Sequence, residues 1–296
     1  MARAKVGEME LEYETFGSPD DPALLLVMGL GAQLIHWPAK FCRMLADGGF
    51  QVIRFDNRDA GLSTKLDGGE VDFVALVAAA LEGREVSDTP YDLSDMSEDA
   101  FGILDDLGIE KAHIVGASLG GMIAQTMAIE RPSRVISLTS IMSATGTREI
   151  LGIPDESLAL LLAPSPTEWA AFLEYLVQYA ILCSKNFFDS VLAREYAAAS
   201  YDRSHYPDGS GRQIAALFAS GDREPDLAEM NVPTLVSHGR DERLLLPLLG
   251  QRTADVIPGA NYLLVSDMGH ALPEPLWPVV VDAVLSHLRN SVSEEE

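Results

Sequence analysis

The stretch Gly116-Ala117-Ser118-Leu119-Gly120 joins an apolar run, 112–115, to a run typical of a helix, 122–130. A serine at such a junction predicts a nucleophile elbow, a strained turn between a strand and a helix that lifts the hydroxyl clear of the sheet. Larger side chains two residues before or after the serine would collide, so the elbow needs glycine on both flanks. Gly121 adds a small residue where the helix must pass close to neighbouring strands. Ser118 is therefore the first candidate for a reacting atom.

Strand-like and helix-like runs alternate on both sides of this turn. Runs typical of strands occur at 6–13, with a turn near Gly7, and at 23–28, 50–55, 112–115, 135–142, 232–237 and 262–265. Helix-like runs separate them at 37–47, from Asp92 or Ser94 to 107, from the elbow to Arg131-Pro132, and up to Ile257 and Arg289. Strands that alternate with helices of this length predict an α/β fold, with a mostly parallel central sheet and helices on both faces.

The pattern changes after the sixth strand. From about 144 to 228 there is no convincing strand, and prolines and glycines separate helix-like stretches. Within 169–181 the apolar residues fall at the spacing of one helix face, which ordinary packing would explain. We therefore expect a core made of residues 1–144 and 229–296, and a helical insertion over residues 145–228.

Composition and charge exclude several classes of protein. The chain has 296 residues, of which 47% are hydrophobic, so it can bury a sizeable core. It carries 21 Lys+Arg against 45 Asp+Glu, a formal net charge of −24. Such a surface repels nucleic acid and anionic membranes. The first sixteen residues lack the apolar stretch of a secretory signal, and no run is apolar enough to span a membrane. We expect a cytoplasmic protein without a nucleic-acid partner.

No cofactor or metal is indicated by the sequence. Cys42 and Cys183 lie far apart in apolar, helix-like surroundings, and they are interpreted as small core residues. The chain has no P-loop, no complete G-x-G-x-x-G and no H-E-x-x-H motif. The chemistry must therefore come from the side chains of the protein itself.

A serine hydroxyl needs a base to take its proton, and histidine is the usual base. The chain has six histidines: His36, His113, His205, His238, His270 and His287. In an open α/β sheet the reacting groups follow the carboxyl ends of strands, and His270 follows the strand ending at Val265. His36 and His238 also follow strands and are the rival candidates. The other three are interpreted as structural, because they begin a strand or lie in helical regions.

The base in turn needs a carboxylate that orients it. Asp241 and Glu242 both follow the strand that ends at Ser237, on the same edge of the sheet. The residues alone leave the choice open between them. Aspartate has fewer rotatable bonds to fix than glutamate, which favours Asp241.

A tetrahedral intermediate also needs hydrogen-bond donors aimed at its oxyanion. The backbone N–H after the nucleophile, here that of Leu119, is expected to be one of them. The second should come from the loop after an early strand, where Gly29 and Gly31 let the chain turn the Leu30 N–H towards Ser118.

Five motifs in order resemble the successive signatures of the α/β-hydrolase family: LLLVMGLG (24–31), IRFDNRDAGLS (53–63), HIVGASLGG (113–121), HGRDE (238–242) and DMGHALP (267–273). The likeness covers nearly the whole chain, and within the family it is closest to bacterial esterases of the aclacinomycin methylesterase type and to lipase/esterase-like proteins of actinobacteria. The resemblance implies Ser118 as nucleophile, His270 as base, Leu30 and Leu119 as oxyanion donors, and a helical cap over the site.

The resemblance also bears on the acid. Family members carry it as the fifth residue of an H-G-x-x-D motif, and counting from His238 reaches Glu242. This register favours Glu242 over Asp241, with glutamate as a departure from the family pattern. Met28 is a further departure, because the family often has histidine at that position. Residues 56–63 match a family motif that is expected to brace the loop beside the site.

The expected activity is that of a serine hydrolase that cleaves carboxylic esters through an acyl-enzyme, as carboxylesterases and methylesterases do. Met28, Leu30, Trp37 and the apolar helix face at Trp169 predict a small, mostly apolar and uncharged ester as substrate. The alternatives are another hydrolysis on the same triad, such as that of thioesters, lactones or carbon–carbon bonds, perhydrolysis, or a ligand-binding protein without turnover. Monomer and homo-oligomer are both compatible with the sequence.

Overall fold

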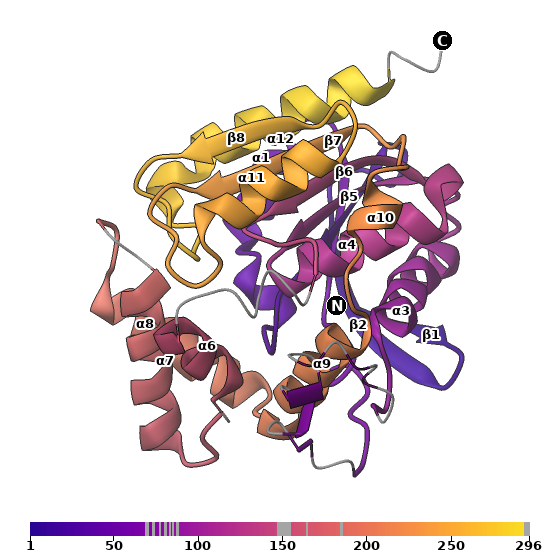
Figure 1. The fold of residues 1–296 in the computed structure, drawn as a ribbon. Helices are drawn as coiled ribbons and strands as arrows, with labels where there is room; N and C mark the ends of the chain where they lie inside the picture. Colours follow the sequence, from indigo (N-terminus) through magenta and orange to yellow (C-terminus); the bar gives the residue numbers. More distant parts are fainter. Residues whose placement is uncertain are drawn as a thin grey trace.

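An eight-stranded sheet forms the centre of the molecule in the computed structural model (Figure 1). The structure describes residues 1–68, 71, 72, 75, 76, 78, 79, 82, 84, 86, 89–146, 155–163, 165–183 and 186–292. The strands are β1 (Ala2–Val6), β2 (Met9–Phe16), β3 (Ala23–Val27), β4 (Gln51–Phe55), β5 (Ala112–Ala117), β6 (Val135–Ile141), β7 (Thr234–Gly239) and β8 (Asn261–Val265). Their order across the sheet is β1-β2-β4-β3-β5-β6-β7-β8.

Most neighbouring strands run parallel. The β1–β2 hairpin, with Gly7 at φ +58° in its turn, pairs antiparallel with β4, and every further pair in the sheet is parallel. The carboxyl ends of β3, β5, β6, β7 and β8 therefore open onto one edge. The predicted α/β fold with a mostly parallel sheet is confirmed.

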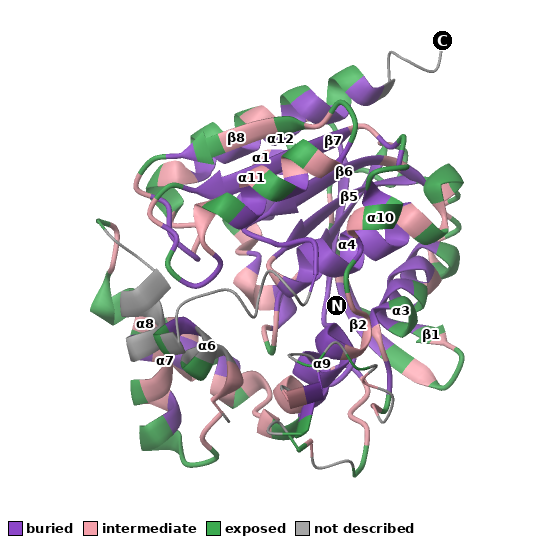
Figure 2. Ribbon diagram, in the orientation of Figure 1, coloured by how far each residue is buried: buried purple, intermediate pink, exposed green. Residues whose placement is uncertain are grey.

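Helices cover both faces of the sheet. Side chains of successive strand residues alternate between two apolar layers, as the pleat requires: Leu24 and Leu26 pack with one, Leu25 and Val27 with the other. The first layer includes α1 (Ala39–Ala46) and α12 (Trp277–Val292), and the second includes α3 (Leu93–Asp106), α4 (Leu119–Glu130) and α11 (Pro247–Val256). Figure 2 shows the strands of this core buried along most of their length.

Local sequence signals begin and end the helices at the expected places. Asp92 caps α3, because its side chain accepts hydrogen bonds from the N–H groups of Ser94 and Asp95, and the Asp95 carboxylate accepts the Asp92 N–H in return. Gly108, at φ +68°, follows the end of this helix in the left-handed conformation that glycine tolerates. The helix after the elbow ends before Pro132.

Between β6 and β7 the chain forms a helical segment, 155–219, made of α6 (Asp155–Leu162), α7 (Trp169–Cys183), α8 (Ser190–Arg203) and α9 (Pro207–Ala219). In Figure 1, α6, α7 and α8 lie together apart from the sheet, and the short α10 (Glu224–Leu227) returns the chain to α4. Cys42 is buried in the core, as expected, whereas the side chains of 178–183, including Cys183, lie outside the described residues.

Two buried ion pairs attach the helical segment to the loop after β4. Asp56 pairs with Arg203 at 2.8 Å, and Asp59 pairs with Arg212, which places two guanidinium nitrogens 2.8 and 2.9 Å from the two carboxylate oxygens. The side chains of Asp56, Asp59 and Arg212 are nearly inaccessible to solvent, and that of Arg203 is 12% exposed. Gly209 passes so close to the backbone of Asp59 that a Cβ there would overlap the Asp59 carbonyl oxygen. The segment is thus fixed to the core by charge as well as by packing.

Candidate active site

Ser118 lies between β5 and α4 in a strained backbone conformation. Its φ and ψ are +56° and −123°, a region that residues other than glycine rarely adopt. The backbone is held there because the Ser118 N–H donates to Ile141 O at 2.9 Å and the Ser143 hydroxyl donates to Ser118 O at 2.8 Å. A Cβ at Gly116 would overlap the backbone of Gly120. The glycines thus permit the close strand-to-helix turn that the sequence indicated.

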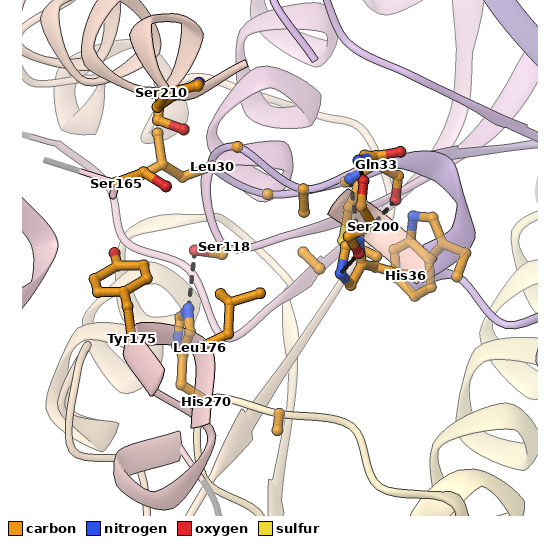
Figure 3. A pocket seen from close by; sticks show the side chains of 18 of the residues that line it. Leu30, Gln33, His36, Ser118, Ser165, Tyr175, Leu176, Ser200, Ser210 and His270 are labelled. Carbon is orange, nitrogen blue, oxygen red and sulfur yellow. Dashed lines mark hydrogen bonds between the residues drawn. The ribbon is translucent and has the colours of Figure 1, made fainter. Parts of the chain in front are cut away.

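His270 and Glu242 follow the ends of β8 and β7 and complete a chain of hydrogen bonds with Ser118. His270 Nε2 lies 2.9 Å from Ser118 Oγ, and His270 Nδ1 lies 2.8 Å from Glu242 Oε2. A carboxylate can only accept, so Nδ1 carries the ring proton and Nε2 presents its lone pair to the serine hydroxyl. This is the tautomer that a base for Ser118 requires (Figure 3).

The Glu242 carboxylate is buried, with 3% of the residue exposed. Burial alone would raise the pKa of Glu242, but the His270 ring and its hydrogen bond, together with the N–H of Leu244, outweigh it and hold the pKa below its usual range. The second carboxylate oxygen accepts from Leu244 N at 2.8 Å and from Leu245 N at 3.3 Å. Glu242 is therefore fixed as an anion beside the imidazole.

Asp241 has a different place from its neighbour. Its N–H donates to Met268 O at 2.9 Å, and its carboxylate accepts from Asp267 N at 3.0 Å. Asp267 stands at φ +63°, in the turn that precedes His270. The preference for Asp241 from rotatable bonds alone therefore points to the wrong partner for His270, whereas the register of the HGRDE motif points to Glu242, which makes the contact.

The loop after β3 lies against the serine. A Cβ at Gly29 would come 3.0 Å from Ser118 Cβ, and Ala32 N donates to Gly29 O at 3.2 Å, which closes a turn around Leu30 and Gly31. Gly31 has φ +62°, as the third residue of a type II turn requires. Within the described part of the chain, neither the Leu30 N–H nor the Leu119 N–H has a hydrogen-bond acceptor. Both N–H groups expected to bind an oxyanion can therefore donate to a substrate oxygen.

A glutamine from the helical segment holds this loop in place. Gln213 of α9 accepts the Gly31 N–H on Oε1 at 2.8 Å and donates from Nε2 to Arg58 O at 2.8 Å. Its side chain is fully buried. Sequence reasoning missed Gln213, because nothing near it in the chain indicates a partner 182 residues away.

The segment 56–63 supports the same loop from the core side. Asp56 accepts the Leu34 N–H at 2.6 Å, and the Asn57 amide donates to Met28 O at 2.8 Å. These contacts agree with the bracing role expected from the sequence motif.

The remaining histidines divide into two groups. His113, His238 and His287 are buried in the core and bond to Ser137 Oγ, Leu245 O and Leu138 O respectively, away from the serine. Burial lowers the pKa of all three, that of His113 to about 4. His36 and His205, in contrast, line the cavity beside Ser118. His205, interpreted from the sequence as structural, has Nε2 2.9 Å from Pro166 O in addition to its place on the cavity wall.

The cavity has a volume of about 390 Å³ and is open to Ser118 and His270. Met28, Leu30 and Trp37 line it, as expected, and α7 adds Phe172 and Leu176. Trp169 does not line it: the residue is 39% exposed and packs edge-on against Tyr201 at 4.9 Å between ring centroids. The apolar face of α7 therefore contributes to the cavity, but its first residue does not.

Among the residues that the structure describes, no group of histidine, cysteine, aspartate and glutamate is placed to hold a metal ion. In the same part of the chain, no helix is long and apolar enough to cross a membrane.

The sheet order and the strained serine between β5 and α4 define a protein of the α/β class with a nucleophile-elbow turn. The chain belongs to the alpha/beta hydrolase fold family, whose sequence model matches residues 22–274.

Relatives of known name cover nearly the whole chain. Rhodomycin D methylesterase DauP of Streptomyces sp. (strain C5) is 28% identical, over 95% of this chain and 96% of its own length. The putative carbamate hydrolase RutD of Variovorax paradoxus (strain S110) is also 28% identical, over 89% of this chain and 90% of its own. Among solved structures, the enol-lactonase from Burkholderia xenovorans LB400 superposes with a TM-score of 0.75 at 22% identity, covering 97% of this chain and 100% of its own.

Proposed function

We propose that the protein is a serine hydrolase that cleaves carboxylic esters through an acyl-enzyme. The observation that carries this is the continuous chain from Glu242 Oε2 through the His270 ring to Ser118 Oγ, with links of 2.8 and 2.9 Å. The named methylesterase and hydrolase relatives support the same class of reaction. The protein acts on a small molecule, since the serine faces a cavity of about 390 Å³.

In the proposed mechanism, Ser118 Oγ attacks the ester carbonyl carbon while His270 Nε2 takes the hydroxyl proton. Glu242 keeps the ring in the required tautomer and stabilises its charged form. The N–H groups of Leu30 and Leu119 donate to the oxyanion, since both lie beside Ser118 without another acceptor in the described residues. His270 then gives its proton to the leaving alcohol oxygen. A water molecule, deprotonated by the same nitrogen, releases the acid and restores the serine.

We propose an uncharged, largely apolar ester as substrate, with an alcohol portion as small as methanol. Met28, Leu30, Leu176 and Trp37 present apolar surface to the cavity, and the net charge of −24 disfavours anionic ligands. The name of the relative DauP, a rhodomycin D methylesterase, supports a methyl ester. We also propose residues 145–228 as a cap on a core of residues 1–144 and 229–296, which the cavity-lining positions on α7, α8 and α9 support.

The first test is Ser118→Ala. The variant should lose all labelling by a fluorophosphonate probe, and its kcat for an aryl ester should fall by about a millionfold, as for other triad hydrolases. Circular dichroism and thermal melting serve as the control for folding. Labelling that persisted in a folded Ser118→Ala protein would place the nucleophile elsewhere. A substrate panel with a carbamate, a lactone and a compound whose carbon–carbon bond is hydrolysed then separates ester cleavage from these alternative reactions.

A further inference from the structure

Three residues form a hydrogen-bonded group on the cavity wall, apart from the serine. Gln33 and His36 lie at the short helix Leu34–His36, and Ser200 belongs to α8. Figure 3 shows them together, separated from the pair of Ser118 and His270. All three line the cavity. This group takes no part in the proposed chemistry.

The hydrogen bonds of this group fix the position of the His36 proton. The backbone N–H of Gln33 points at His36 Nδ1, at 3.0 Å, and a backbone N–H can only donate. Gln33 O lies 3.2 Å from the same nitrogen, but a proton on Nδ1 would meet the N–H proton head-on. His36 therefore carries its proton on Nε2. Burial lowers the pKa of His36, which keeps the ring neutral.

The His36 Nε2–H then donates to Ser200 Oγ, 3.2 Å away. The hydroxyl proton of Ser200 therefore needs a different acceptor. Other helix hydroxyls of this chain give theirs to a carbonyl four residues earlier: Ser220 to Ala216 O, Thr253 to Leu249 O and Ser291 to His287 O. Ser200 makes no such bond, and nothing else in the described residues accepts from it. It is 4% exposed and lines the cavity.

Trp37, also on the cavity lining, does not add a second donor to the cavity. Trp37 follows His36 in the chain, lines the cavity and is 2% exposed. Its indole N–H has no hydrogen-bond partner among the described residues. The indole nitrogen is closed off from the cavity, so a ligand oxygen does not reach it. An unsatisfied buried donor costs about 1–3 kcal/mol, so the Ser200 hydroxyl on the cavity wall calls for a ligand that accepts from it.

We propose that the Ser200 hydroxyl, oriented by His36, is a subsite for a hydrogen-bond acceptor oxygen of the substrate, such as a ketone or ether oxygen, away from the ester that reacts. Because His36 already donates to Ser200, the subsite offers the hydroxyl proton of Ser200 and selects an acceptor group over a second donor. This inference rests on the proposed function, and it narrows the substrate class to apolar esters that carry one further acceptor oxygen in the acyl or alcohol part.

A series of ketones tests the subsite, because a ketone oxygen accepts hydrogen bonds and cannot donate them. We would measure kcat/KM for an aryl octanoate and for its oxo-octanoates with the keto group at each carbon from 4 to 7. At least one isomer should be preferred over the parent by about tenfold, the worth of one hydrogen bond to a buried group. Ser200→Ala should reduce that ratio, and Ser165→Ala, at another serine on the cavity lining, should keep the wild-type ratio.

Binding to the Ser118→Ala protein separates this inference from the proposed function. If the triad assignment is wrong, wild-type turnover is absent or survives Ser118→Ala, yet calorimetry should still find the favoured oxo isomer bound about tenfold more tightly than the parent. The subsite is refuted if no isomer is preferred in kcat/KM or in Kd. It is equally refuted if the preference persists unchanged in Ser200→Ala.

Discussion

The sheet edge that carries Ser118, His270 and Glu242 and the helical segment that faces it are built by different rules. Each of the three side chains follows the end of its own strand by no more than a few residues. The contacts of the helical segment instead join residues far apart in sequence: Ser200 and His36 are 164 residues apart, and Gln213 and Gly31 are 182 apart. The reacting groups are thus specified by local strand ends, whereas the substrate wall depends on tertiary packing.

The largest loss of activity should come from a substitution among the catalytic side chains at the sheet edge. Glu242→Gln removes the anion that fixes the His270 tautomer, so kcat should fall by about 10³- to 10⁴-fold. Asp241→Asn keeps an oxygen that can accept from Asp267 N, and its kcat should change by less than about tenfold. Steady-state kinetics on one aryl ester measure both. If the two losses were equal, the acid would not be assigned to Glu242, and adjacent residues at a strand end would not differ in role.

The next largest effect, a loss of stability, is expected where the helical segment is attached to the core. The hydrogen bonds and charge of Asp59 raise the pKa of Arg212, which stays charged. Arg212→Met would leave the buried Asp59 carboxylate without its ion-pair partner, with only the Tyr91 hydroxyl and the Leu66 N–H donating to it. The free energy of unfolding should fall by about 3–5 kcal/mol. Arg194, in α8 of the same segment, lies 4.0 Å from Glu174 and is half exposed, so Arg194→Met should cost less than about 1 kcal/mol.

Urea denaturation followed by tryptophan fluorescence compares the two arginine variants with the wild type. Similar losses of unfolding free energy for both variants would show that the buried pair of Asp59 and Arg212 adds nothing to stability. The segment would then be held by apolar packing alone.

A smaller loss of activity is expected at Gln213, where the helical segment contacts the oxyanion loop at the sheet edge. Gln213→Met keeps the side-chain volume but leaves the Gly31 N–H without its acceptor, which frees the central peptide of the 29–32 turn to flip. The oxyanion loop loses order, and kcat should fall by about 10- to 100-fold, less than the full loss of one oxyanion donor.

Substrate binding gives the control for Gln213. KM should change little, while the affinity for a boronic acid, which mimics the tetrahedral state, should fall with kcat. A rise in KM at constant kcat would instead make Gln213 part of the substrate wall alone.

The difference between the two regions also explains what the sequence could predict. The strands, the elbow, the Asp92 cap and the helix end at Gly108 each follow from a few neighbouring residues. His270 follows from the rule that reacting groups stand after strand ends. Glu242 follows from motif register, since rotamer arguments favoured its neighbour.

The cavity wall escaped prediction because its determinants are not local. His205 lies in a helical region without a strand nearby, and its place on the wall depends on how α8 and α9 pack. The apolar face of α7 was visible in the sequence, yet Trp169 turns towards Tyr201 rather than the cavity. No pattern around Gln213 or Ser200 signals partners more than 150 residues away.

The close approach of Gly209 to Asp59, together with the two buried ion pairs, sets a condition for chimeras of this enzyme. A helical segment transplanted from a relative would leave the buried carboxylates of Asp56 and Asp59 without their paired guanidinium groups unless it brought arginines to positions 203 and 212. It would also need a glycine at position 209. Recombination between homologues that divides the segment from the loop after β4 should therefore yield mostly insoluble products. The segment and that loop form one exchangeable unit, although the chain places them on opposite sides of the elbow.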